Sequence, residues 1–156
     1  MKNIMLILSL LSLSLFAEKI TLTTIKNEFI IFHNNKGNID FVNKKYHQKN
    51  VILYLFGRDC PFCKKEVPRI KALMKNKKVQ IIGIHAYKDI GDKALKAYAK
   101  KVGYTFDILS FKNDIKMLNF LKSIGVWMGS VPFSILIDED GNVHEVNLSM
   151  IDEELD

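Results

Sequence analysis

Residues 51–66, VILYLFGRDCPFCKKE, decide the fold of this chain. They begin with a continuous apolar run at residues 51–56, rich in β-branched and aromatic side chains, which predicts a strand covered on both faces of a mixed sheet. A short turn with one glycine follows, and Pro61 then stands at the first position of a helix, where its missing N–H is no loss. The two cysteines of the chain, Cys60 and Cys63, therefore open a helix that follows a buried strand.

The helix that begins at Pro61 is expected to be amphipathic, with one apolar side and one side covered by lysines. The apolar residues that recur at helical spacing are Phe62, Val67, Ile70, Leu73 and Met74. Pro68 falls inside this helix and removes a backbone donor, so we expect it to bend the axis or to divide the helix in two.

Strand-like and helix-like segments follow one another along the rest of the chain, with turn residues between them. Residues 20–25 and 28–32 predict the two strands of an edge hairpin, followed by a turn at residues 34–38. The other predicted elements are a strand at 79–86, a helix at 92–101, a strand at 104–109, a helix marked by Ile115, Leu118, Leu121 and Ile124, and a closing hairpin of strands at 133–138 and 142–148. This order predicts an α/β fold, a mixed β-sheet flanked by helices, with an N-terminal β-hairpin.

The composition is that of one globular domain. With 156 residues, 48% of them hydrophobic and 26% charged, the chain can bury one core and is neither disordered nor a coiled coil. The formal net charge is +6, but almost all of the positive charge is lysine, and Arg58 and Arg69 are the only arginines. A nucleic-acid groove usually needs more arginine, so we expect no nucleic-acid partner.

Residues 1–17 have the pattern of a signal peptide. One lysine precedes an apolar run that is too short to span a membrane, and Ala17 offers a small residue at a cleavage point before Glu18. Leu15 stands where a small residue is preferred, which leaves open an uncleaved N-terminal membrane anchor. We therefore expect residues 18–156 to form one domain in the periplasm or another extracytoplasmic compartment.

The spacing of the cysteines favours a redox-active dithiol over a structural disulfide or a metal site. A bridge across so short a loop constrains the unfolded chain little. A zinc site needs about four ligands, and none of the four histidines has a metal-ligand spacing to the pair, so we expect no metal and no cofactor. At a helix N-terminus, with Arg58 and Lys64 nearby, a thiolate at Cys60 is stabilised. Cys60 would then attack a partner disulfide, and Cys63 would resolve the mixed disulfide.

These motifs make the sequence similar to the thioredoxin-fold, TlpA-like exported thiol-disulfide oxidoreductases, which include the thioredoxins of cytochrome c maturation. The resemblance covers about residues 38–148 and rests on separated matches. They are the buried strand before Cys60-Pro-Phe-Cys63, the residues Lys64, Lys65, Glu66 and Pro68, the pair Val131 and Pro132, and the run 135–138 ahead of Gly141. In that family a tryptophan commonly precedes the first cysteine. Here Arg58 and Asp59 stand in its place, so we expect an atypical active-site surface.

The resemblance implies an enzyme that acts on protein thiol and disulfide substrates. Its implied role is that of a reductant in cytochrome c maturation, fed by a membrane thiol carrier, with apocytochrome c as the leading substrate. The Pro-Phe pair between the cysteines is more typical of oxidising proteins, which leaves a Dsb-type disulfide oxidase or isomerase as an alternative. A second alternative is a non-catalytic binding or chaperone module in which the dithiol anchors a partner or a metal ion.

The resemblance also implies roles for three residues outside the cysteine pair. Pro132 would be a cis-proline that faces the dithiol, and Val131 would offer its backbone to an extended substrate. Glu66 lies three residues after Cys63, hence on the same helix face, where its carboxyl group would shuttle the proton of the resolving thiol. An exposed glutamate paired with a lysine is the alternative for Glu66. Tyr54 occupies the place of the buried acid of ordinary thioredoxins.

Three further residues stand out without a settled role. His85, at the end of a predicted buried strand, is expected to be a packed histidine and not a ligand. Trp127 is expected either to line a substrate groove or to fill the core. Asn147 lies in residues 145–149, which resemble the extended acidic sequon of bacterial N-glycosylation.

Overall fold

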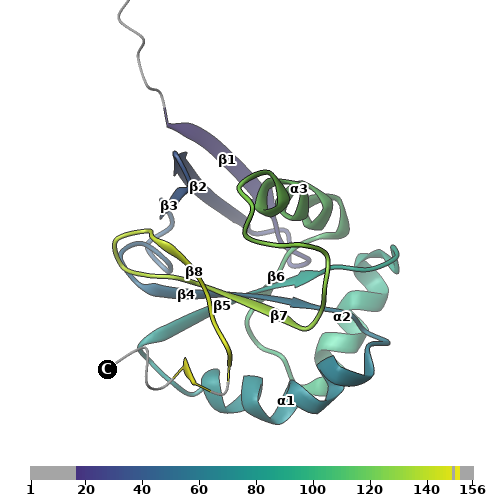
Figure 1. Ribbon diagram of the computed structural model, residues 1–156. Helices are drawn as coiled ribbons and strands as arrows, with labels where there is room; N and C mark the ends of the chain where they lie inside the picture. Colours follow the sequence, from purple (N-terminus) through teal and green to yellow (C-terminus); the bar gives the residue numbers. More distant parts are fainter. Residues whose placement is uncertain (1–16, 149, 152–156) are drawn as a thin grey trace, which may run out of the picture.

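The computed structural model describes residues 17–148 and 150–151, which form two β-sheets and three α-helices (Figure 1). The strands are β1 (Glu18–Thr23), β2 (Phe29–Asn35), β3 (Asn38–Phe41), β4 (Asn50–Phe56), β5 (Val79–His85), β6 (Asp107–Ile108), β7 (Phe133–Ile137) and β8 (Val143–Glu145). The helices are α1 (Pro61–Leu73), α2 (Gly91–Val102) and α3 (Phe111–Ser123).

Strand β4 lies at the centre of the larger sheet, as the sequence predicts. The five strands of this sheet follow the order β6-β5-β4-β7-β8. Strand β4 pairs in parallel with β5 and antiparallel with β7, so the sheet is mixed. All residues from Val51 to Phe56 are buried, because other elements cover both faces of the sheet.

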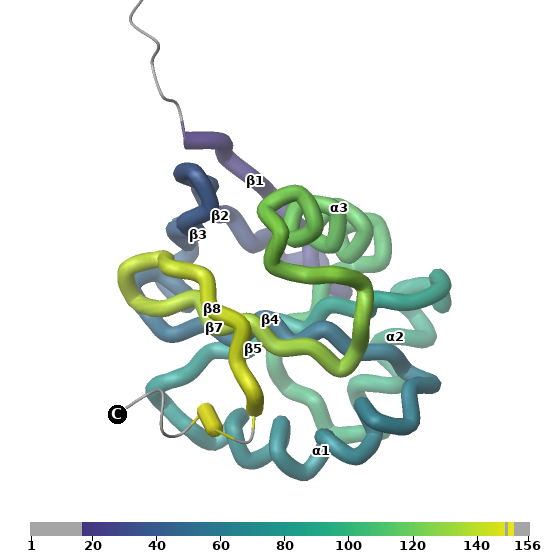
Figure 2. Tube along the Cα trace, in the orientation of Figure 1, coloured from purple at the N-terminus to yellow at the C-terminus, as the bar shows by residue number. Residues whose placement is uncertain are grey.

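Successive side chains of β4 point to opposite faces and enter two separate cores. Ile52 and Tyr54 pack in the core that includes Ile70 of α1 and side chains of α2. Val51 and Leu53 pack in the other core, with side chains of the smaller sheet and of α3. Figures 1 and 2 show this layering, with α1 on one side of the sheet and α3, together with β1 and β2, on the other.

The N-terminal hairpin is present, but it does not form an edge of the main sheet as predicted. Strands β1, β2 and β3 form a separate antiparallel sheet. Its inward side chains, among them Leu22 and Phe32, are buried in the core on the α3 side, and the burial of this apolar face determines where the sheet packs. Just after β1 the chain contacts the segment that follows β6, where Thr24 forms an isolated bridge with Leu109.

Two predicted strands are shorter than expected. Of residues 104–109 only Asp107–Ile108 form a strand, and of residues 142–148 only Val143–Glu145 do. Both strands lie at the ends of the sheet order, so each pairs with one neighbouring strand and not with two.

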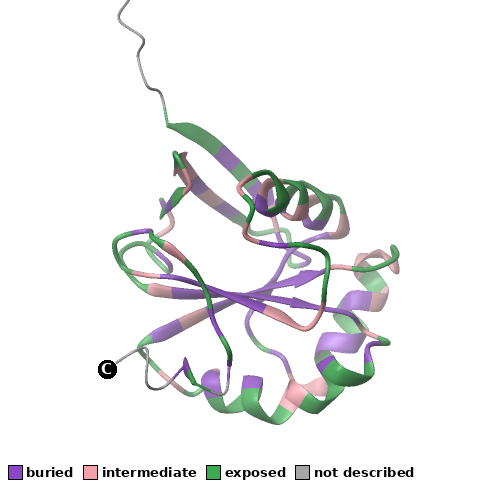
Figure 3. Ribbon diagram, viewed as in Figure 1, coloured by how far each residue is buried: buried purple, intermediate pink, exposed green. Residues whose placement is uncertain are grey.

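The helices are present, but two of their apolar faces are rotated from the prediction. Helix α1 is continuous with Pro68 inside it, and Phe62, expected on its apolar face, is 65% exposed. Helix α3 buries Asp114 and Leu121 but exposes Ile115. Several overlapping sets of apolar positions fit a 3.6-residue period, and tertiary packing determines which set is buried. Figure 3 shows the resulting pattern, with buried residues facing the sheet and exposed residues on the outer helix surfaces.

Within residues 17–148 and 150–151, no helix has the length and apolar character needed to cross a membrane.

Candidate active site

The dithiol lies where β4 ends and α1 begins. Because β4 and β5 are parallel, their last residues, Phe56 and His85, pair at the same edge of the sheet. The chain leaves β4 through Gly57, where an added Cβ would overlap the ring of Tyr87. A side chain at this position would displace the ring, so the close approach of Tyr87 requires glycine. Three residues later, Cys60 caps the helix.

Backbone groups hold the sulfur of Cys60. Its Sγ accepts a hydrogen bond from the N–H of Cys63 at 3.1 Å, as expected of an N-cap side chain. This N–H and the helix dipole stabilise negative charge on the sulfur. On its other side the Cys60 thiol donates to the carbonyl oxygen of Val131 at 3.9 Å. Cys60 also lines a pocket of about 410 Å³ together with Pro61 and Tyr87, which gives this cysteine a path to solvent.

Cys63 lies one helical turn further along α1 and is 1% exposed, against 6% for Cys60. Its sulfur accepts a hydrogen bond from the N–H of Gly57 at 3.4 Å. Burial raises the pKa of Cys63 to about 12; Cys60 and the charge of Glu66 act in the same direction, and the hydrogen bond from Gly57 opposes them. The two thiols therefore differ, because Cys60 borders a solvent-open pocket whereas Cys63 is buried and retains its proton.

The loop before β7 brings Val131 and Pro132 to the dithiol. The peptide bond between them is cis, in line with what the family resemblance implies. Trp127 braces this loop, since its indole N–H donates to the carbonyl oxygen of Ser130 at 2.7 Å. Trp127 is buried in the core on the α3 side, so it fills the core and does not line a groove.

Glu66 lies on α1, one turn beyond Cys63, and is half-buried. It lines a pocket of about 550 Å³ whose wall includes Pro132, Ser134 and Glu145. Burial raises the pKa of Glu66, while Arg69 acts in the opposite direction. Within the described residues Glu66 forms no ion pair with a lysine, so its environment differs from that of a solvated helix glutamate. The pocket thus places the Glu66 side chain beside the cis-proline.

Replacing Glu66 with glutamine tests whether this carboxyl group accepts the proton of the Cys63 thiol. We expect the Glu66→Gln variant to show a lower Cys63 pKa, because a negative charge that opposes the thiolate is removed. We also expect resolution of the mixed disulfide to slow by about tenfold or more, because the proton acceptor is lost, with little change in the initial attack by Cys60. Thiol titration and stopped-flow reduction of a disulfide peptide measure the two effects.

The control for this variant is Glu145→Gln, which removes a second carboxylate from the wall of the same pocket but lies on β8 and not on the helix that carries Cys63. It should leave both the Cys63 titration and the resolution rate unchanged. If Glu66→Gln resolves as fast as the parent protein with Cys63 titrating unchanged, Glu66 is a surface helix residue.

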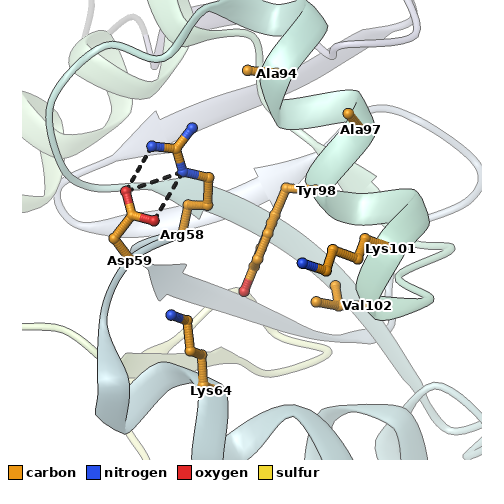
Figure 4. A pocket seen from close by; sticks show the side chains of 8 residues that line it. All are labelled: Arg58, Asp59, Lys64, Ala94, Ala97, Tyr98, Lys101 and Val102. Atoms are coloured by element: carbon orange, nitrogen blue, oxygen red, sulfur yellow. Dashed lines mark hydrogen bonds and ion pairs between the residues drawn. The ribbon is translucent and has the colours of Figure 1, made fainter.

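Arg58 contributes less positive charge to the site than its sequence position suggests. Its guanidinium group donates to the carboxylate of the adjacent Asp59, with a shortest distance of 2.7 Å (Figure 4). The ion pair offsets the positive charge that Arg58 was expected to place near Cys60. Lys64, in the wall of the adjoining groove, and Lys88, in the wall of the pocket that Cys60 lines, are nearby cations for which the described residues show no such pair. Arg58, Asp59 and Lys64 border a groove of about 700 Å³ on the α2 side of the dithiol. Tyr98 of α2 forms part of its wall.

His85 and Tyr87 belong to the site, although the sequence assigned neither of them to it. His85 is buried, as expected, but its Nε2 also accepts a hydrogen bond from the N–H of Arg58 at 3.3 Å. The sequence contains a signal for this placement: residues 79–86 predict a strand next to residues 51–56, and parallel strands end at the same edge.

No group of three or more potential metal-ligating side chains occurs in the part of the chain that the structure describes.

Comparison with known sequences identifies the relatives of this chain. The family model described as Redoxin matches residues 21–154. Thiol-disulfide oxidoreductase ResA of Bacillus anthracis is 36% identical over 101 residues, which cover 62% of this chain and 53% of that protein. ResA of a Bacillus cereus strain is 35% identical over 101 residues, with the same coverage of 62% and 53%. The chain thus spans about half the length of the curated relatives it matches.

Solved structures share the fold. StoA from Bacillus subtilis superposes with a TM-score of 0.61 at 16% sequence identity, covering 91% of this chain and 99% of that one. A thioredoxin-like protein from Aeropyrum pernix gives a TM-score of 0.60 at 16% identity, covering 86% of each chain. The predicted thioredoxin-like α/β fold is therefore confirmed.

Proposed function

The chain belongs to the Redoxin family, and on this basis we propose that it is a thiol-disulfide oxidoreductase that acts on protein substrates through Cys60 and Cys63. The observation that carries the proposal is the asymmetry of the two thiols. Cys60 caps α1 and borders a solvent-open pocket, whereas Cys63 is buried behind it with a raised pKa. This arrangement gives one cysteine for attack and a second, protected cysteine for resolution.

In the proposed reaction the Cys60 thiolate attacks one sulfur of a substrate disulfide. The substrate S–S bond breaks, one substrate sulfur leaves as a thiolate, and the other becomes bonded to Cys60. Cys63 then transfers its proton to Glu66 and attacks Sγ of Cys60, which releases the second substrate sulfur as a thiolate. The substrate gains two electrons, and the protein is left with a disulfide between Cys60 and Cys63.

Val131 and Pro132 have the proposed role of substrate contacts. The carbonyl oxygen of Val131 already faces the Cys60 sulfur, so a substrate chain that reaches this sulfur passes along the same backbone. An extended segment can add main-chain hydrogen bonds there, which do not depend on its sequence. This mode suits an enzyme that acts on many cysteine-containing peptides.

Within this class we propose a reductant in cytochrome c maturation, with apocytochrome c as substrate and a membrane thiol carrier as electron source. The similarity of the motifs to TlpA-like proteins supports this assignment. The Pro-Phe pair at residues 61–62 favours the second candidate, a Dsb-type disulfide oxidase or isomerase. The direction of electron flow follows from the reduction potential of the dithiol relative to that of its partners.

Two measurements test the proposed function. The reduced protein should reduce the disulfides of insulin, and the dithiol should equilibrate with glutathione or dithiothreitol at a defined two-electron potential. A potential near that of thioredoxin, about −270 mV, supports the reductant, and one near about −120 mV supports the oxidase. Failure to reduce insulin or to exchange with either reagent would leave a dithiol binding module as the function.

We also propose that the protein acts outside the cytoplasm, after export directed by residues 1–17. Residues 1–16 lie outside the described part of the chain, so the support for this proposal is the sequence pattern. N-terminal sequencing of the protein recovered from the exporting cell should find Glu18 as the first residue. Met1 on membrane-bound material would instead identify the segment as an anchor.

A further inference from the structure

Two side chains behind the dithiol contain buried polar atoms that lack a hydrogen-bond partner among the described residues. They are Nδ1 of His85, at the end of β5, and Oδ2 of Asp114, on α3. His85 is 2% exposed and Asp114 is fully buried. Buried polar groups are almost always paired, so two unpaired groups on neighbouring residues call for an explanation in terms of function.

The remaining polar atoms of these residues link α3 to the dithiol through a series of hydrogen bonds. Oδ1 of Asp114 accepts the N–H of His85 at 3.2 Å. Nε2 of His85 accepts the N–H of Arg58 at 3.3 Å. The preceding residue, Gly57, donates its N–H to Sγ of Cys63 at 3.4 Å, and its carbonyl oxygen accepts the N–H of Cys60 at 3.2 Å. The segment that carries both sulfur contacts is therefore held by His85.

The hydrogen bond from the N–H of Arg58 requires that Nε2 of His85 be unprotonated. A backbone N–H can only donate, so Nε2 must carry a lone pair, and neutral His85 carries its proton on Nδ1. Protonation of Nε2 would place two N–H donors against each other and remove the bond to Arg58. The loop between β4 and α1 would then lose its link to β5.

We propose that His85 is a positioning residue for the dithiol: neutral, it holds the Gly57–Cys60 loop through the N–H of Arg58, and protonation of Nε2 releases that loop. Asp114 supports this role by fixing the backbone N–H of His85 from α3. The proposal deepens the proposed function, because it assigns a control of the same two cysteines. It makes the geometry at Cys60 depend on pH in mildly acidic solution.

The charges around His85 are arranged to keep it neutral near pH 7. Burial lowers the pKa of His85, and Arg58 acts in the same direction, while Asp59 and Asp89 oppose them. Burial raises the pKa of Asp114 to about 9, so this carboxyl group is uncharged near pH 7 and does not attract a proton to the imidazole. The other titratable side chains around its pocket are those of Cys60, Tyr87 and Lys88.

The test uses the full-length reduced protein and the hydrogen exchange of individual amides, followed by NMR. In the parent protein the protection of the Arg58 N–H, corrected for the intrinsic exchange rate, should fall about tenfold as the pH drops from about 7.5 to about 4.5. The fall should follow the ring resonances of His85. The His85→Gln variant keeps an acceptor at the distance of Nε2 but does not titrate, so its Arg58 N–H should stay protected over the whole range.

Two further variants complete the experiment. His85→Leu has no acceptor, and its Arg58 N–H should be unprotected at every pH. His144→Gln, in an exposed position on β8, is the matched control and should behave like the parent protein. Protection in the parent that does not change with pH, or a transition in His85→Gln equal to that of the parent, would overturn the proposal. Because exchange is measured without substrate, these results are independent of insulin reduction, which alone tests the proposed function.

Discussion

Cys60→Ser protein should reduce no disulfide substrate, and Cys63→Ser protein should accumulate a covalent complex with it. The serine hydroxyl is not ionised near neutral pH and cannot replace the thiolate as nucleophile, so we expect the first variant to lose on the order of 10³-fold or more in rate. In the second variant Cys60 still attacks through the pocket that it borders, but no second thiol follows it on α1. The mixed disulfide therefore persists.

Mass spectrometry of each variant, after incubation with a disulfide peptide, measures both outcomes. The Cys63→Ser sample should gain the mass of one peptide half, and dithiothreitol should remove it. The Cys60→Ser sample should gain nothing, and the double variant serves as its control. If the adduct forms on Cys63 and not on Cys60, the order of attack and resolution proposed from burial is wrong.

The central part of the fold was predictable because local signals and the tertiary structure agree there. The apolar run at residues 51–56 is buried on both faces, and Pro61 and Cys60 begin α1 where the sequence predicts a helix. The placement of the N-terminal hairpin was not predictable. Alternating apolar residues indicate that one face is buried, but they do not say whether the partner is a sheet edge or a sheet face.

The candidate site likewise contains residues that the sequence predicts and residues that it does not. The cysteine pair and Pro132 belong to motifs that can be read along the chain. The positions of His85 and Asp114 depend on how β5 and α3 pack against each other. The spacing of residues within either element does not specify this packing. The ion pair of Arg58 with Asp59 was also missed, because adjacent side chains pair only when a turn brings them to the same side.

Asp114→Asn protein should be more stable than the parent at pH 8 and have nearly the same stability at pH 4. Burial raises the pKa of Asp114 to about 9, whereas the same group in the unfolded chain titrates near about 3.9. Between these values the folded protein keeps a proton that the unfolded chain has released, so the free energy of unfolding falls as the pH rises. The contribution of this group is fully present below about pH 4 and is lost as the pH rises towards 9.

Asparagine has no proton to release, so the advantage of the variant should grow with pH across this window. Its Oδ1 can still accept the N–H of His85, which keeps the link between α3 and β5. We expect a gain of at least about 2 kcal/mol at pH 8 relative to pH 4, which urea unfolding at the two values measures. Asp140→Asn, in the exposed turn between β7 and β8, is the control and should show no such gain.

An equal stability difference between Asp114→Asn and the parent at both pH values would mean that Asp114 is ionised in the folded protein. A buried carboxylate would then stand behind His85 and favour its protonated form. Protonated His85 cannot accept the N–H of Arg58, so the same measurement bears on how the loop before Cys60 is held. The stability of one buried acid on α3 is in this way connected to the geometry of the attacking thiol.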